Sequence, residues 1–131
     1  MNARPPREAQ HPAGRPQNMS AQSLRLAARL ADPRTEKQVE HACDLMMERL
    51  GFAVVRLSQA RRSNIHVGLP DRRYYCVPRR LACWFECKRV GGKQSEAQRE
   101  FQLMVMACNE DYVVGQESAL LAWLRDHKVI V

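Results

Sequence analysis

A continuous apolar run from Leu81 to Phe85 ends directly in Glu86 and, two residues later, Lys88. Such a run is typical of a strand in a sheet that is covered on both faces. A glutamate and a lysine at the end of a buried strand cost free energy unless they are used. Because alternate side chains of a strand share a face, both project to the same side. The run therefore predicts a covered sheet with a charged site at one strand end.

A second acid, Asp71, follows the turn formed by residues 68–70. Residues 72–77 and the apolar run read as the two strands of a hairpin, which places Asp71 and Glu86 at the same end. Carboxylates suit Mg²⁺ or Mn²⁺, and a neighbouring lysine can hold or deprotonate the water that attacks phosphorus. A Glu-x-Lys pair alone is more often an exposed charged pair. The two segments together favour a metal site for phosphodiester hydrolysis.

An amphipathic helix is predicted before these strands. It begins after Thr35 with a capping box and ends at Gly51. Its apolar stripe consists of Val39, Ala42, Cys43, Met46, Met47 and Leu50. Glu36 lies about 55° from the centre of this stripe, so it either joins the metal site or favours the positive end of the helix dipole. Glu40 and Asp44 are expected to face solvent.

The remaining pattern completes an α/β fold with a central mixed sheet flanked by helices. The further elements that we expect are a strand at 52–57, a helix from a capping box at Ser95 to about Cys108, a strand at 112–114, a helix at 117–126 and a strand at 129–131. The predicted order is α-β-β-β-α-β, followed by a C-terminal α-β.

The length and composition allow one folded domain. The 131 residues, of which 45% are apolar, suffice for a single core. Residues 1–33 contain several prolines and arginines and almost no bulky apolar side chain before Leu24. We expect a disordered basic leader there, with a short helix from Ser23 to Leu30, and the folded domain at residues 34–131.

Positive charge is concentrated around the predicted metal site. The formal net charge is +7, and residues 56–93 hold ten Lys and Arg side chains against two acids. Such a surface attracts a phosphate backbone, whereas a solvated basic face is the simpler alternative. The side chains that we expect to contact DNA are Arg61, Arg62, Arg72, Arg73, Arg89 and Lys93.

The five cysteines are expected to be reduced and mostly buried, since their number is odd and several lie on apolar faces. Cys83 and Cys87 would be about 13 Å apart on one strand, too far for one zinc ion. No stretch has the length and apolar content of a signal peptide or membrane span. We expect a cytoplasmic, DNA-associated protein without a membrane partner.

The order of these residues resembles the virus-type replication-repair nuclease (VRR-NUC) domain of the PD-(D/E)XK superfamily, in its stand-alone phage or bacterial form. The resemblance covers roughly residues 35–115. The segments that carry it are Glu36, Gly68-Leu69-Pro70-Asp71, Phe85-Glu86-Cys87-Lys88, Gly91-Gly92 and Ser95-Glu96-Ala97-Gln98. It implies a restriction-endonuclease-like core.

The resemblance also implies roles for individual residues. The catalytic set would be Glu36, Asp71, Glu86, Lys88 and Gln98. Asp71, Glu86 and the backbone carbonyl of Cys87 would bind Mg²⁺ or Mn²⁺. Glu36 would complete the acidic set, and Lys88 would orient or activate the attacking water.

Three positions allow more than one interpretation. Gln98 occupies the position of a family glutamine near the metal-bound water, and an N-terminal helix cap explains the same residue. Arg72 and Arg73 stand where the family more often has apolar residues. Their strand is therefore an edge strand, or its arginines reach DNA phosphates, or Arg72 shapes the site. Cys87 replaces a more usual aliphatic residue, which matters little if only its carbonyl is used.

The resemblance predicts a metal-dependent, structure-specific DNA endonuclease. Small stand-alone members of this kind are similar to phage-type homodimers that act on four-way (Holliday) junctions. A dimer is physically sensible, because two symmetric cuts need two sites related by a twofold axis. The alternatives are a flap, nicking or restriction-like nuclease with the same site, or a non-catalytic basic DNA-binding module.

Overall fold

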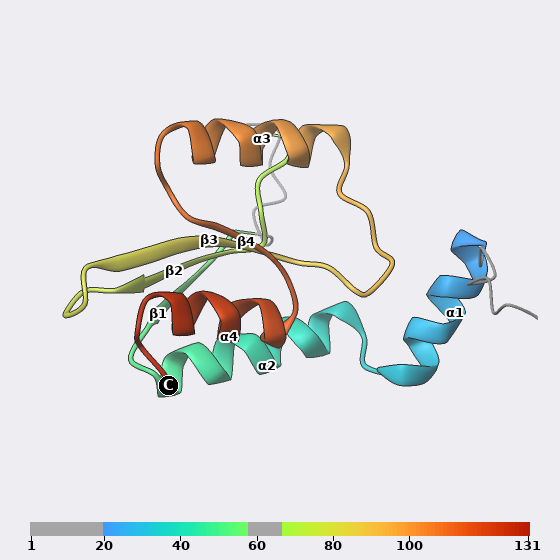
Figure 1. Cartoon of the computed structure of the whole chain (residues 1–131), viewed down its shortest axis with the longest axis horizontal. Coiled ribbons are helices and arrows are strands. Elements are labelled where there is room, and N and C mark those ends of the chain that lie inside the picture. The colour runs from blue at the N-terminus through green and yellow to red at the C-terminus, as the bar shows by residue number, and fades with distance from the viewer. Residues whose placement is uncertain (1–19, 58–66) are drawn as a thin grey trace, which may run out of the picture.

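The computed structural model describes residues 20–57 and 67–131, and this part of the chain folds as an α/β protein with a four-stranded mixed sheet between helices (Figure 1). The elements, in chain order, are α1 (Ala21–Ala31), α2 (Glu36–Arg49), β1 (Ala53–Arg56), β2 (Arg72–Cys76), β3 (Leu81–Cys87), α3 (Glu96–Ala107), β4 (Tyr112–Gly115) and α4 (Glu117–Asp126). These confirm the helices and strands expected between residues 35 and 126, and α1 agrees with the short helix expected at 23–30.

The strand expected at residues 129–131 is wrong. This segment consists of apolar residues, but it pairs with no strand of the described sheet. Val129 and Ile130 instead pack, partly buried, against the apolar core. Their burial by side-chain packing explains the apolar signal without a strand.

The sheet has the order β1-β2-β3-β4, with β1, β2 and β3 antiparallel and β4 parallel to β3. Helices α2 and α4 cover one face and α3 covers the other (Figure 1). The buried strand β3 is therefore covered on both sides, as its apolar run predicts. β2 lies inside the sheet, so the interpretation of its two arginines as marks of an edge strand is wrong.

Local capping signals begin the two helices that flank the site. The Thr35 side chain accepts a hydrogen bond from the Gln38 amide, and Gln38 Oε1 accepts one from the Thr35 amide. Ser95 and Gln98 form the same reciprocal pair at the start of α3. Both capping boxes are as predicted, and each satisfies backbone donors that the first helical turn leaves unpaired.

The core lies between the sheet and the α2–α4 layer. Val39, Cys43 and Met47 of α2 are fully buried there, which confirms the predicted stripe. Phe85 and Cys87 of β3 face the same core. The alternate side chains of β3 face α3, where Trp84 packs edge-on against the Phe101 ring with the ring centroids 5.2 Å apart. This alternation sends Glu86 to the α3 side of the sheet.

Four of the five cysteines, Cys43, Cys76, Cys83 and Cys87, are buried free thiols, as expected, whereas Cys108 is free and exposed. Burial raises the pKa of Cys43 and of Cys83 to about 12. Thiols with such pKa values are poor nucleophiles, and they pack as small apolar side chains.

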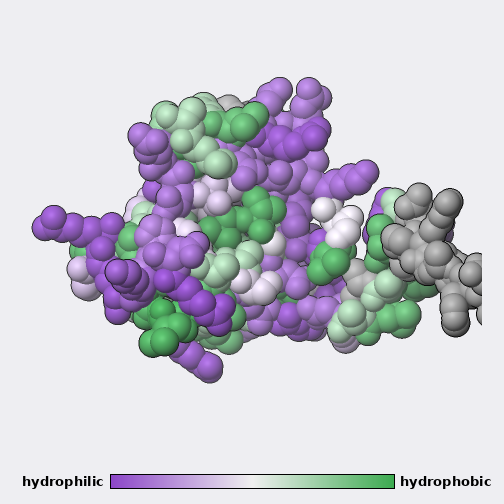
Figure 2. All heavy atoms as spheres, in the orientation of Figure 1, coloured by the Kyte–Doolittle hydropathy of each residue, from purple (hydrophilic) through white to green (hydrophobic). Residues whose placement is uncertain are grey.

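α1 stands beside the rest of the fold, near the amino-terminal end of α2 (Figure 1). Its Leu24, Leu26 and Leu30 side chains are exposed, and apolar surface is visible in this region (Figure 2). None of the described helices combines the length and apolar content needed to cross a bilayer.

Candidate metal centre

The β2–β3 hairpin brings Asp71 and Glu86 to the same end of the sheet. Arg72 pairs with Phe85 in the strand register, so one further step places Asp71 opposite Glu86. The Cys87 amide donates a hydrogen bond to Asp71 Oδ2 at 2.9 Å. This bond fixes the Asp71 carboxylate against the end of β3, as the hairpin topology predicts.

Three carboxylates converge at this sheet end. Glu36 and Glu40 of α2 and Asp71 each offer an oxygen, and these oxygens lie within 4.8 Å of one another. Burial raises the pKa of both glutamates, and the charge of Asp71 raises them further. Like charges held this close repel one another, so the cluster favours a cation or a proton between its members.

Glu40 was missed by the sequence analysis, and its expected solvent exposure is wrong. Its side chain is only 12% exposed and lies 3.4 Å from Arg72. The signal was present: Glu36 and Glu40 are four residues apart, so they are neighbours on one helical face. Its large angle from the apolar stripe indicated solvent exposure, but Arg72 at the start of β2 lies against its carboxylate.

Glu86 lies beside this cluster, fully buried on the α3 side. Its Oε1 accepts a hydrogen bond from the Tyr112 hydroxyl at 2.8 Å. Its Oε2 is buried without a hydrogen-bond partner among the described residues and lies 3.9 Å from Lys88 Nζ. The Glu86 charge also contributes to the raised pKa of Glu36. A buried carboxylate oxygen without a donor has the chemistry of a position that a cation completes.

Arg72 connects this site to the core. Its Nε donates to both carboxylate oxygens of Asp44, at 3.0 and 3.1 Å, and its Nη1 donates to the Asp71 carbonyl at 2.9 Å. Tyr74 donates to the same Asp44 at 2.8 Å. Asp44 is 2% exposed, so its predicted solvent exposure is wrong: the arginine and the tyrosine satisfy it inside. Arg72 is itself 6% exposed, so it offers little surface to a DNA phosphate.

The turn before Asp71 is pressed against the start of α3. A Cβ atom at Gly68 would come within 2.4 Å of the Ala97 carbonyl oxygen. Gln98, in the same first turn, uses its side-chain oxygen to cap the helix. The helix-cap interpretation of Gln98 is therefore confirmed, while its second role, near water at the metal, stays a prediction.

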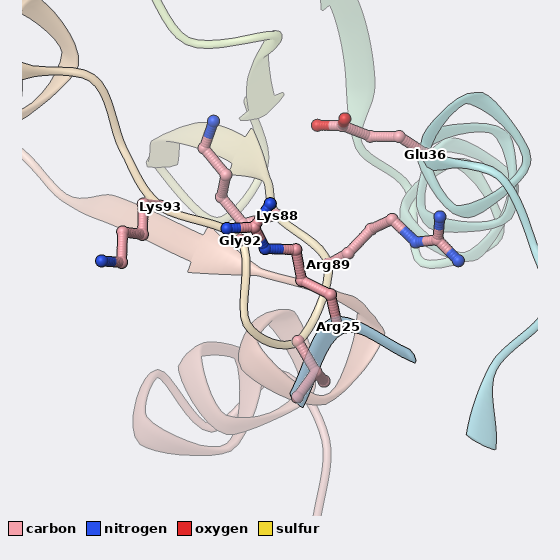
Figure 3. A pocket seen from close by; sticks show the side chains of 7 residues that line it. Arg25, Glu36, Lys88, Arg89, Gly92 and Lys93 are labelled. Atoms are coloured by element: carbon pink, nitrogen blue, oxygen red, sulfur yellow. The ribbon is translucent and has the colours of Figure 1, made fainter. Parts of the chain in front are cut away.

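The basic residues expected to contact DNA have different surroundings. Arg73 is paired with Glu110 at 3.0 Å and stacks over the Trp84 ring at 4.4 Å, with its side chain 11% exposed. Arg89 and Lys93 line an open hollow beside Glu36 (Figure 3). Arg61 and Arg62 lie outside the described residues. Arg89 and Lys93 are thus the described members of the expected set that border the site openly.

Comparisons with protein-family models, with curated proteins and with solved structures found no match. The α/β architecture with its four-stranded mixed sheet is what the structure shows.

Proposed function

We propose that this protein is a divalent-metal-dependent DNA endonuclease with a PD-(D/E)XK core of the VRR-NUC kind. The observation that carries the proposal is that the carboxylates of Glu36, Glu40 and Asp71 meet beside Glu86. Glu86 Oε2 is buried and accepts no hydrogen bond from the described residues. Lys88 extends from the same strand end, with its side chain 21% exposed. Acids and a lysine so placed favour phosphodiester hydrolysis over a purely structural ion-pair cluster.

The donor set fits Mg²⁺ or Mn²⁺, since all of its members are oxygens. Asp71, Glu86 and the Cys87 carbonyl would hold the ion, with Glu36 and Glu40 on the α2 side. The ion, when bound, supplies positive charge that stabilises the developing negative charge at phosphorus. The Cys87 amide already holds Asp71 in place at 2.9 Å, so this ligand needs no rearrangement.

In the proposed reaction, Lys88 positions the water molecule that acts as the nucleophile. Its ammonium lies 3.9 Å from Glu86 Oε2, close enough to hold a water molecule between the two groups. The water oxygen forms a bond to phosphorus as the bond from phosphorus to the sugar oxygen breaks on the opposite side. The proton of the water passes to solvent, and the departing sugar oxygen takes a proton from solvent. The remaining function of Lys88 is electrostatic, because its charge offsets that of the phosphate oxygens.

The proposal is tested by cleavage of DNA with Mg²⁺ or Mn²⁺. Asp71→Ala and Lys88→Ala should each lower kcat roughly 10³-fold or more, because metal and water positioning contribute several kcal/mol. DNA binding should be largely retained. Glu48→Ala is the matched control, since it removes an exposed acid of the same helix layer. Full cleavage by both site variants would contradict the assignment.

The second candidate is a basic DNA-binding module, favoured by the charge of residues 56–93. In this alternative the acids only balance arginines, as Asp44 does for Arg72. The two candidates differ in one measurement. If the unmodified protein cuts none of duplex, flap and four-way junction DNA with either ion, the binding module is the better account.

A further inference from the structure

A hollow of about 270 Å³ opens between α1, the first turn of α2 and the loop after β3 (Figure 3). The described residues that line it are Arg25, Glu36, Lys88, Arg89, Val90, Gly92 and Lys93. Four of them are basic, and one is acidic. With roughly 30 Å³ for each water molecule, the space accommodates a phosphate group and several waters.

The hollow adjoins the candidate metal centre. Glu36 lines it and belongs to the carboxylate cluster as well. Glu36 and Lys93 lie on opposite sides of the hollow in the close-up view (Figure 3). An anion in the hollow would therefore lie next to the phosphate at the metal, within the same stretch of backbone.

The position of α1 beside this hollow is set by its neighbours. The Arg25 Cγ lies 3.9 Å from the point where a Cβ on Gly91 would stand, so the glycine loop passes beside the helix. Arg89 donates to the Asp32 carbonyl, just after α1, at 3.2 Å. Arg34 binds the Asp32 carboxylate at 2.8 Å and thereby stiffens the connection to α2.

We propose that this hollow binds a phosphate of the nucleic-acid backbone next to the scissile one, and that Arg25 of α1 is one of its contacts. The proposal rests on the proposed nuclease function for the identity of the anion. Guanidinium and ammonium groups are the usual partners of backbone phosphates. The segment read from sequence as a basic leader thus contributes directly to the substrate site through its helix.

The experiment measures the affinity of the full-length chain for a labelled DNA duplex over a series of KCl concentrations, in EDTA so that no hydrolysis occurs. Arg25→Ala should weaken binding roughly three- to tenfold on any sequence and reduce the salt slope by about 0.7–0.9. Arg125→Ala removes the same charge from an exposed position in the last turn of α4 and should change neither quantity. Arg25→Lys should restore most of the affinity.

Alanine is a better helix former than arginine, so Arg25→Ala should keep α1 helical. Arg25→Lys keeps the aliphatic stem beside Gly91, so its recovery of affinity separates the lost charge from a displaced helix. Equal affinities and slopes for Arg25→Ala and Arg125→Ala overturn the phosphate contact. The same conclusion follows if the unmodified chain does not bind duplex DNA. The two proposals fail distinguishably. Cleavage without an Arg25 effect overturns only the hollow, whereas an Arg25 effect without cleavage overturns the nuclease and leaves Arg25 as a contact to a backbone phosphate that is not next to a scissile one.

Discussion

Arg72 shows how one buried side chain joins the core to the candidate site. It holds Asp44 on α2 and the Asp71 carbonyl at once, and it also lies against Glu40. The sequence allowed three interpretations of this arginine, and the strand order and the burial of Arg72 decided among them. The structure supports the interpretation in which Arg72 shapes the site.

Replacing Arg72 with methionine should lower the free energy of unfolding by about 3 kcal/mol, because the buried Asp44 would lose its nearest cation. Only the longer pair with the more exposed Arg56, at 3.6 Å, would remain. Urea denaturation measures this change. Tyr74→Phe is the matched control: it removes one hydrogen bond to Asp44 and should cost only about 1 kcal/mol. An Arg72→Met protein as stable as Tyr74→Phe would show that the pair contributes little.

Glu36 and Glu40 make the metal-free site sensitive to pH. The folded-state pKa of Glu36 is raised, first by burial and then by Asp71, so its contribution to stability is complete below about pH 4.3 and is lost as pH rises through the raised pKa. The glutamine side chain of the Glu36→Gln variant is neutral at every pH in this range. Without divalent ions, its Tm relative to the unmodified protein should increase between pH 4 and pH 8 by about 1–3 °C, a value reduced by solvent screening.

Thermal unfolding in EDTA checks this difference, and Mn²⁺ provides the contrast. At pH 8, Mn²⁺ should raise the Tm of the unmodified protein more than that of Glu36→Gln, because the ion replaces the repulsion with ligation. A Tm difference that is the same at pH 4 and pH 8 would contradict the inferred strain among the acids.

At the scale of elements, the local signals were sufficient for most of the fold. Capping boxes at Thr35 and Ser95 begin α2 and α3 as predicted, because such bonds depend only on residues within one turn. The strand predicted at residues 129–131 is wrong for the opposite reason, since the apolar character of this segment does not come from local bonds. Val129 and Ile130 are apolar because they pack on the core, and periodicity in three residues cannot separate packing from strand pairing.

The turn that carries Asp71 depends on a glycine at its contact with α3. Gly68 has φ +92°, and a Cβ there would lie 2.4 Å from the Ala97 carbonyl oxygen. Gly68→Ala should therefore cost more than the roughly 1–2 kcal/mol of a left-handed backbone alone. It should also raise the Mn²⁺ concentration needed for half-maximal cleavage, since Asp71 is displaced.

Gly51→Ala is the matched control for this change. Gly51 has the same φ of +92° but nothing within 4 Å of the added Cβ. Its substitution should cost about 1–2 kcal/mol in unfolding free energy and leave the Mn²⁺ requirement unchanged. Equal losses for the two variants, measured by urea denaturation, would show that the contact with α3 is relaxed easily.

At the scale of the whole molecule, the proposed nuclease has one metal centre in each 15.1 kDa chain. Symmetric cutting of a four-way junction needs two such centres, so we expect a homodimer in solution. Light scattering should give a mass of about 30 kDa, twice that of one chain. An immobile junction should be cleaved in preference to linear duplex and flap DNA, with Glu48→Ala behaving as the unmodified protein.

A monomer that cleaves all three substrates equally would contradict junction resolution and favour the restriction-like or flap alternatives. This outcome would not contradict the proposed metal-dependent hydrolysis, because the same residues carry out each of these reactions. Substrate choice thus depends on surfaces around the site, whereas the reaction depends on the site itself.

The local features of this protein could be predicted from its sequence alone: the helix caps, the buried strand, the hairpin and the acids Glu36, Asp71 and Glu86 at their ends. These follow from spacing and from the two periods of helix and strand. Only the tertiary structure decided that Glu40 joins the acids, that Asp44 and Arg72 are buried together, and that Arg25 borders the site. Such contacts join residues far apart in the chain, and whether a charge is buried depends on what packs over it.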